Sequence, residues 1–189
     1  GFIVDNFNGD AYTWETIVDN GSNVMSIRWN SSEAMNDLAK TPELALTGGT
    51  SYTLRFDLRT GSFDENLAVI VYDDSGTAMD TLLNFVNYLM PYETKTVNFT
   101  VASDGNYRIG YYGYSAQDEF RIYVDNISIV ETPACPPVLS VSVSDITENS
   151  ARANWDNVGA DYQIVWDLAG FDPEGAIAVD VMDTTYEMI

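Results

Sequence analysis

The chain has 189 residues, with 29 acidic against 8 basic side chains and a formal net charge of -21. This negative charge excludes binding to nucleic acids and to anionic membrane surfaces, because both require clustered Lys and Arg. The absence of histidine removes the Ser-His-Asp triad and most zinc sites. With 46% hydrophobic residues the chain can bury a core, but no apolar run is long enough for membrane insertion.

Residues 1–105 alternate short strand patterns with turns rich in Gly and Asp. Apolar side chains at every second position predict strands over 52–59, 67–71 and 97–101. Turns such as Asn8-Gly9-Asp10 separate these strands. One short helix is predicted over 32–39, with a serine as its cap. Many short strands joined by such turns are typical of an antiparallel sandwich or barrel.

The stretch 106–130 predicts two strands joined by a polar turn. In the first, Tyr107, Ile109 and Tyr111 alternate with smaller or polar residues, which indicates a half-buried strand. In the second, the apolar parity changes at Asp125-Asn126, so we expect a β-bulge there. The bulge would bring an acidic side chain into an apolar strand. A buried carboxylate requires a partner, and a bound cation is one solution.

A change in composition divides the chain. Three prolines within residues 132–137 predict a stiff, extended linker that contains the single cysteine, Cys135. One cysteine cannot form a disulfide within the chain. Residues 138–189 then show a second strand pattern with Trp155 and Trp166 as candidate core residues. The opening residues, GFIVDNF, suggest a mature or excised fragment of a longer protein.

Residues 1–130 resemble the cleaved-adhesin and choice-of-anchor-J jelly-roll modules of secreted bacterial surface proteins, the gingipain adhesin regions among them. The resemblance rests on segments distributed over nearly the whole stretch. They are Asp5-Asn-Phe-Asn-Gly9 with Trp14, Asp37-Leu-Ala-Lys-Thr-Pro-Glu-Leu44, Thr50-Ser-Tyr-Thr-Leu-Arg-Phe56, Gly105-Asn-Tyr-Arg-Ile-Gly-Tyr111 and Tyr123-Val-Asp-Asn-Ile-Ser-Ile129.

Residues 137–189 resemble the first part of a fibronectin type III domain, through Ser150-Ala-Arg-Ala-Asn-Trp155 and Asp161-Tyr-Gln-Ile-Val-Trp166. Together the two resemblances imply an all-β protein, a jelly-roll β-sandwich followed by an incomplete fibronectin type III-like β-sandwich. The expected boundaries are 1–131 for the first domain, 132–137 for the linker and 138–189 for the second.

The first candidate site is a structural calcium ion where the first and last strands of the jelly roll meet. Calcium takes six to eight oxygen ligands, and related jelly rolls carry calcium at this junction. The candidate ligands are Asp5, Asn8, Asp10 and Asp125. In the alternative interpretation, Asp5 and Asp10 are ordinary turn residues and Asp125 accepts backbone N–H groups.

The second candidate site is a ligand-binding face made of residues on the outward parity of their strands. Aromatic rings can stack on the C–H surfaces of a sugar, and an arginine can hold its hydroxyls. The candidates are Arg59, Tyr72, Tyr112 and Tyr114. A solvated sheet face or a protein interface would show the same residues, since tyrosine is frequent at both.

The resemblance implies a non-catalytic, secreted or cell-surface adhesion module of a larger multidomain bacterial protein, which binds a glycan or a host or surface protein. One alternative is a carbohydrate-binding module that targets a polysaccharide-degrading enzyme. Another is a structural spacer or filament subunit that self-associates. Enzymatic activity is not expected, because the sequence has no histidine and no recognisable nucleophile constellation.

Overall fold

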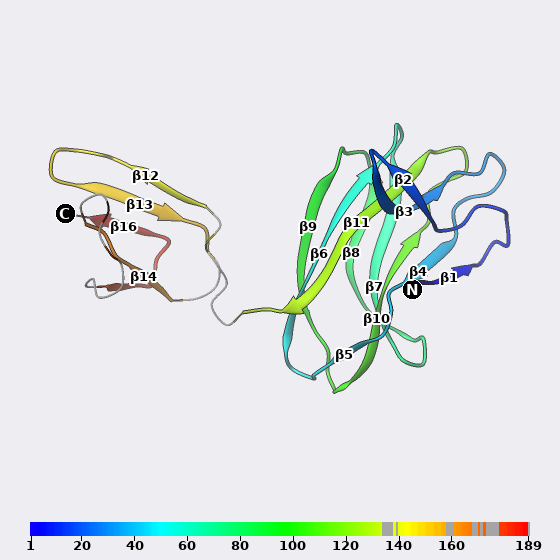
Figure 1. The fold of residues 1–189 in the computed structure, drawn as a ribbon, viewed down its shortest axis with the longest axis horizontal. Coiled ribbons are helices and arrows are strands. Elements are labelled where there is room, and N and C mark those ends of the chain that lie inside the picture. The colour runs from blue at the N-terminus through cyan, green and yellow to red at the C-terminus, as the bar shows by residue number, and fades with distance from the viewer. Residues whose placement is uncertain are drawn as a thin grey trace. The chain divides into compact units, whose positions relative to one another are not determined.

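The computed structural model describes residues 1–133, 138, 140–157, 161–167, 170, 172 and 178–188, and its strands fall into two units (Figure 1). Unit 1 is Gly1–Thr132 and unit 2 is Pro133–Ile189. Every regular element in the described residues is a β-strand. These residues include no helix that could span a membrane. Cys135 and most of the predicted linker lie outside the described residues.

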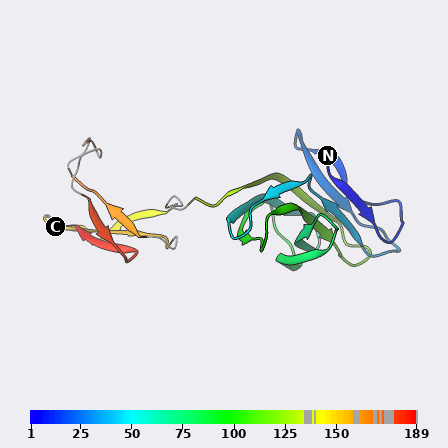
Figure 2. The same cartoon turned by 90° about the horizontal axis from the view of Figure 1, so that it is seen from below.

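Unit 1 is a sandwich of two antiparallel sheets that face each other (Figure 2). Sheet A has the strand order β1-β4-β10-β7-β8, and β5 also pairs with β10. Its strands are β1 (Ile3–Asn6), β4 (Asp37–Lys40), β5 (Leu44–Leu46), β7 (Glu65–Asp73), β8 (Ala78–Tyr88) and β10 (Gly105–Gly113). Sheet B has the order β2-β3-β11-β6-β9. Its strands are β2 (Glu15–Asp19), β3 (Ser22–Arg28), β6 (Ser51–Thr60), β9 (Glu93–Thr100) and β11 (Arg121–Glu131).

The predicted alternation places the core between these sheets. On β10, Tyr107, Ile109 and Tyr111 are buried. The inward residues of β6 and β7 are buried as well, as their period of two predicts. They are Tyr52, Leu54, Phe56, Leu58, Leu67, Val69 and Val71. The prediction of an all-β sandwich is therefore confirmed.

The helix predicted over 32–39 is wrong. Residues Asp37–Lys40 form β4, which lies between β1 and β10 in sheet A. Leu38 and Ala39 are buried there. Pairing on both edges and burial of these side chains outweigh the weak helical preference of a short segment.

The predicted bulge in β11 is confirmed. The register between β11 and β6 shifts between Asp125 and Ser128, and Asn126 has a positive φ of 51°. Asn126 Nδ2 donates to Asp57 Oδ2 at 2.7 Å, which fixes the bulge to β6. The shift lets Ile122 and Val124 before the bulge, and Ile129 after it, all contact the core.

The described residues of unit 2 form two small antiparallel sheets. One has the order β12-β13-β16, and the other pairs β14 with β15. Two aromatic pairs lie in this unit, Trp155 with Tyr162 at 5.5 Å and Trp166 with Tyr186 at 5.3 Å between ring centroids. The fibronectin type III assignment stays a prediction. The strands are β12 (Val141–Ser144), β13 (Ala151–Trp155), β14 (Tyr162–Ile164), β15 (Val179–Val181) and β16 (Thr185–Met188).

The core of unit 1 contains one polar group whose removal we expect to stabilise the fold. Tyr111 is fully buried, its ring lies 5.4 Å from that of Phe56, and its hydroxyl has no hydrogen-bond partner. Burial also raises the pKa of this hydroxyl. An unsatisfied buried hydroxyl costs about 1–3 kcal/mol, so Tyr111→Phe should raise the melting temperature.

The matched variant Tyr111→Ala should lower the melting temperature, because truncation of a buried aromatic side chain costs about 3–5 kcal/mol. Thermal unfolding of both variants is the measurement. A loss of stability in Tyr111→Phe would mean that the hydroxyl has a partner, and would contradict the packing described here.

Candidate functional site

The outer side of sheet A carries three of the four tyrosine and arginine residues predicted to bind a ligand. Because Tyr111 faces the core, its neighbour Tyr112 on β10 faces outward, and Tyr114 continues the same parity. Tyr72 lies on the adjacent strand β7, where its register partner is Arg108. We call Tyr72, Tyr112 and Tyr114 together the tyrosine face.

The rings of the tyrosine face are held in place by neighbouring side chains. Tyr112 stacks on Tyr114 with 5.6 Å between centroids and 17° between planes, and Phe7 contacts Tyr112 edge-on at 6.5 Å. The Tyr112 hydroxyl donates to Asn36 Oδ1 at 2.8 Å, and the Tyr114 hydroxyl donates to Asn84 Oδ1. The rings are only half-buried, so this arrangement leaves pre-positioned aromatic surface in contact with solvent.

Gly110 allows Tyr72 to lie close against the sheet. A Cβ atom at Gly110 would lie 2.5 Å from Tyr72 Cε2 and 2.8 Å from Leu38 Cδ1, so no larger residue fits without movement of the ring. Lys40 Nζ lies 5.9 Å from the Tyr72 ring centroid and forms an ion pair with Asp5 at 2.8 Å. The tyrosine face therefore combines aromatic rings with an adjacent pair of opposite charges.

Arg59 does not belong to the tyrosine face. It lies on β6 in sheet B, and its guanidinium is 3.7 Å from the Tyr123 ring centroid and 5.0 Å from that of Tyr92. Arg59 Nη2 also donates to Asp19 Oδ2 at 2.8 Å. Two aromatic rings and a carboxylate already hold the Arg59 guanidinium. These contacts indicate that Arg59 stabilises sheet B.

The four candidate calcium ligands are not brought into one cluster. Asp5 pairs with Lys40. Asp10 accepts from Tyr12 N at 2.8 Å and from Asn30 Nδ2 at 2.6 Å, and the Asn8 amide donates to Ala34 O at 2.9 Å. Asp125 lies on sheet B and is only half-buried; its Oδ1 accepts from Asn126 N at 2.8 Å. In the part of the chain that the structure describes, no three Asp, Glu, His or Cys residues form a group suited to a metal.

One carboxylate near Asp10 lacks a complete set of partners. Asp37 is fully buried; its Oδ2 accepts from Asn36 N at 3.1 Å, and its Oδ1 has no partner. Burial raises the pKa of Asp37, and the negative charge of Asp10 raises it further. The Thr13 hydroxyl, also buried, lies close enough to Asp37 to lower its pKa as a hydrogen-bond donor, although burial has the larger effect. Asp10 and Asp37 are therefore two carboxylates close enough to influence each other, whereas Asp5 and Asp125 lie on different sheets.

Sequence reasoning missed the residues that support the tyrosine face and the buried Asp37. Asn36 and Asp37 fell within the predicted helix, so their position next to β10 was not predicted. Phe7 and Lys40 reach the face only because β1 pairs with β4 and β4 pairs with β10. The sequence signal that would have helped is the run Asp37-Leu-Ala-Lys40 read as a buried strand.

No protein-family model matches the chain, and no curated protein matches it. Solved structures do. The K1 cleaved adhesin domain of Lys-gingipain from Porphyromonas gingivalis W83 has a TM-score of 0.55 and 17% identity, over 70% of this chain and 91% of that one. The K3 cleaved adhesin domain of the same protein has a TM-score of 0.55 and 20% identity, over 69% of this chain and 91% of that one.

The N-terminal cellulose-binding domain of Cellulomonas fimi β-1,4-glucanase C has a TM-score of 0.51 and 18% identity, over 71% of this chain and 91% of that one. Unit 1, Gly1–Thr132, makes up a similar share of the chain. The chain therefore contains a jelly-roll sandwich similar to the cleaved adhesin domains of gingipain and to carbohydrate-binding modules.

Proposed function

We propose that unit 1 is a non-catalytic, extracellular binding module and that the tyrosine face is its glycan-binding surface. The observation that carries this proposal is the stacked pair Tyr112 and Tyr114 on the outer side of sheet A, half-exposed and fixed by hydrogen bonds. A ring that is already fixed loses little conformational entropy when a ligand stacks on it.

The chemistry around the rings also suits a sugar. Aromatic rings offer flat surface for the C–H groups of a pyranose, while Asp5 and Lys40 offer a hydrogen-bond acceptor and a donor for its hydroxyls. The fold likeness to a cellulose-binding domain supports a glycan ligand. The fold likeness to cleaved adhesin domains and to a cellulose-binding domain supports binding rather than catalysis.

The two other interpretations of the sequence predict different roles for the tyrosine face. A module that adheres to a surface protein would also use exposed tyrosines, since these are enriched at protein interfaces. A pure spacer or filament subunit would not need the tyrosine face at all. A glycan array with the full chain, read alongside its size-exclusion profile, separates the three.

We expect Tyr112→Ala and Tyr114→Ala to weaken glycan binding while the fold is retained. Truncation of an aromatic residue at the centre of a binding site typically costs about 2 kcal/mol, which is roughly a thirtyfold loss of affinity. The measurement pairs calorimetric affinity with the melting temperature of each variant.

Tyr92→Ala is the matched control, because Tyr92 is an exposed tyrosine that contacts Arg59 of sheet B. It should leave glycan affinity unchanged. Equal losses in Tyr92→Ala and Tyr112→Ala would show that the effect is not specific to the tyrosine face. Unchanged binding in both tyrosine-face variants would remove the proposal.

We also propose that a structural calcium ion is bound near Asp10 and Asp37. The support is the unpaired Oδ1 of a fully buried carboxylate beside a second carboxylate. Bound calcium would neutralise that charge and stabilise the turn between β1 and β2. Asn side chains, backbone carbonyls and water would supply the remaining oxygens.

Chelation tests the calcium proposal. A ligand that binds only the folded state adds about 2.7 kcal/mol at a hundredfold excess over its dissociation constant, so EDTA should lower the melting temperature by several degrees. Asp37→Asn should abolish this response, whereas Asp125→Asn should retain it. If EDTA has no effect and Asp37→Asn raises the melting temperature, the carboxylate is simply a buried charge without a cation.

A further inference from the structure

A groove opens between the two sheets of unit 1, on a side of the sandwich that the tyrosine face does not include. Its volume is about 730 Å³, and its walls come from β1 and β5 on sheet A and from β2, β3 and β11 on sheet B. Most of its lining is apolar. The apolar lining includes Phe2, Val4, Met25, Ile127 and Ile129.

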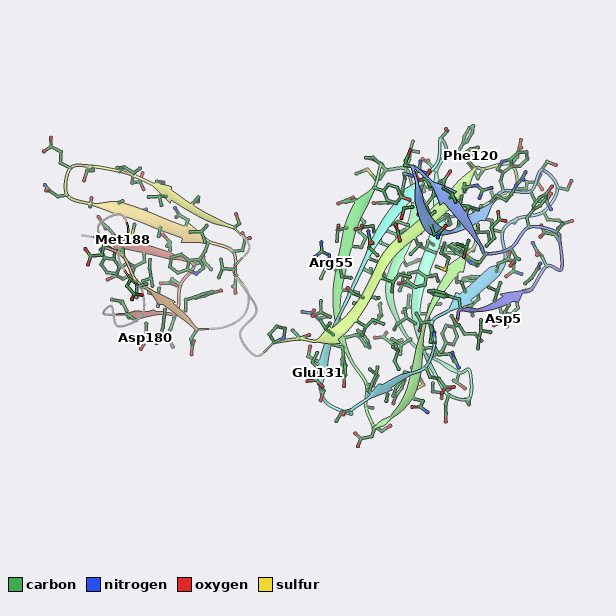
Figure 3. All side chains as sticks on the ribbon, in the orientation of Figure 1. Asp5, Arg55, Phe120, Glu131, Asp180 and Met188 are labelled. Carbon is green, nitrogen blue, oxygen red and sulfur yellow. The ribbon has the colours of Figure 1, made fainter. Side chains whose placement is uncertain are left out.

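One wall of the groove is an unpaired strand edge. β6 pairs with β11 from Ile122 to Glu131, but β3 pairs with β11 only from Arg121 to Val124. In Figure 1, β2 and β3 flank only the upper part of β11, and the lower part continues to its end with β6 as its one neighbouring strand. Glu131 marks that end in Figure 3. No other strand in the described part of the chain pairs with β11.

The direction of the backbone groups follows from one hydrogen bond. Thr132 N donates to Ser51 O at 2.8 Å, so at this position the chain directs its N–H toward the β6 side. Successive residues of a strand direct their N–H and C=O groups to alternate edges. Ile129 and Glu131 therefore direct theirs away from β6, to the edge that β3 leaves open. This edge offers the donors and acceptors that an additional strand requires.

The side chains that line the groove beside this edge are apolar and at least partly exposed to solvent. Phe2 is 42% and Val4 40% exposed, and Ile127 and Ile129 are half-buried. Contiguous apolar surface of this kind marks an interaction site in a folded protein. The combination of an open strand edge with an apolar groove specifies the shape of the ligand, because only an extended chain satisfies both features at once.

We propose that this groove binds an extended segment of a partner polypeptide, which adds a strand to β11 and inserts alternate apolar side chains between the sheets. The charged residues of the groove are Glu15 and Asp125, and the chain has a net charge of -21. The partner strand is therefore neutral or basic, since an acidic segment would be repelled. The groove is lined by none of the three tyrosines of the tyrosine face, so this inference does not depend on glycan binding.

The test uses a fluorescein-labelled octapeptide in which valine alternates with threonine and lysine, added to the full chain. Anisotropy reports binding, and amide hydrogen exchange measured by NMR reports the site. We expect the amides of Ile129 and Glu131 to exchange more slowly in the presence of the peptide. The same octapeptide N-methylated at every residue has identical side chains but no backbone N–H donor on either edge, and we expect no binding from it.

Two variants that replace valine by lysine on different surfaces complete the test. Val4→Lys places a charge in the groove and should weaken peptide binding by about tenfold, which corresponds to about 1.4 kcal/mol. Val130→Lys introduces the same charge at a residue of β11 that does not line the groove and is 58% exposed, and should change affinity by less than about twofold. Melting temperatures show whether each variant is folded.

Three results would overturn the proposal. One is unchanged exchange at Ile129 and Glu131 with the peptide present. The second is equal binding of the methylated peptide, which would indicate an apolar pocket without strand pairing. The third is slower exchange of the same amides at high protein concentration without peptide, which would make a second copy of this chain the occupant.

Discussion

The packing of one side of β10 against sheet B is the constraint on which the rest of unit 1 depends. Tyr107, Ile109 and Tyr111 are all buried, and β10 pairs with β4 and β5 on one edge and with β7 on the other. Since side chains alternate along a strand, burial of these three determines that Tyr112 faces outward. A slip of one residue would bury Tyr112 and expose Tyr111, so the core and the tyrosine face are two consequences of one register.

The bulge in β11 has a comparable effect on sheet B. By inserting an extra residue at Asn126, it keeps Ile129 in contact with the core after Val124 has already been buried. The same irregularity ends the pairing with β3 at Val124. The bulge therefore both completes the core and leaves one edge of β11 open. Bulges commonly redirect or end strand pairing, because they disrupt the ladder and increase the local twist.

Much of this architecture follows from the sequence, because period-two alternation is a strong signal where one face of a strand is buried. It predicted the inward residues of β6, β7 and β10, and the parity change at Asp125-Asn126 predicted the bulge. The helix over 32–39 failed because a short segment is decided by its neighbours in the fold, and β4 lies between two strands that are distant in sequence.

The candidate site was less predictable, for a physical reason. Alternation shows whether a side chain faces the core or solvent, but it does not show which of two sheets carries it. Arg59 and Tyr112 both face outward, and only the strand order places them on different sheets. The ion pair of Lys40 with Asp5 could not be predicted for the same reason, since it forms only because β1 pairs with β4.

The central claim, that the tyrosine face binds the ligand, is tested most directly by NMR of protein with ¹³C-labelled tyrosine rings. The titrant is the oligosaccharide with the strongest signal on the glycan array. If the tyrosine face binds the oligosaccharide, the ring signals of Tyr72, Tyr112 and Tyr114 will shift together and saturate at one dissociation constant, while those of Tyr12 and Tyr92 stay in place. Saturable shifts confined to Tyr12 and Tyr92, with the three face signals unmoved, would contradict it.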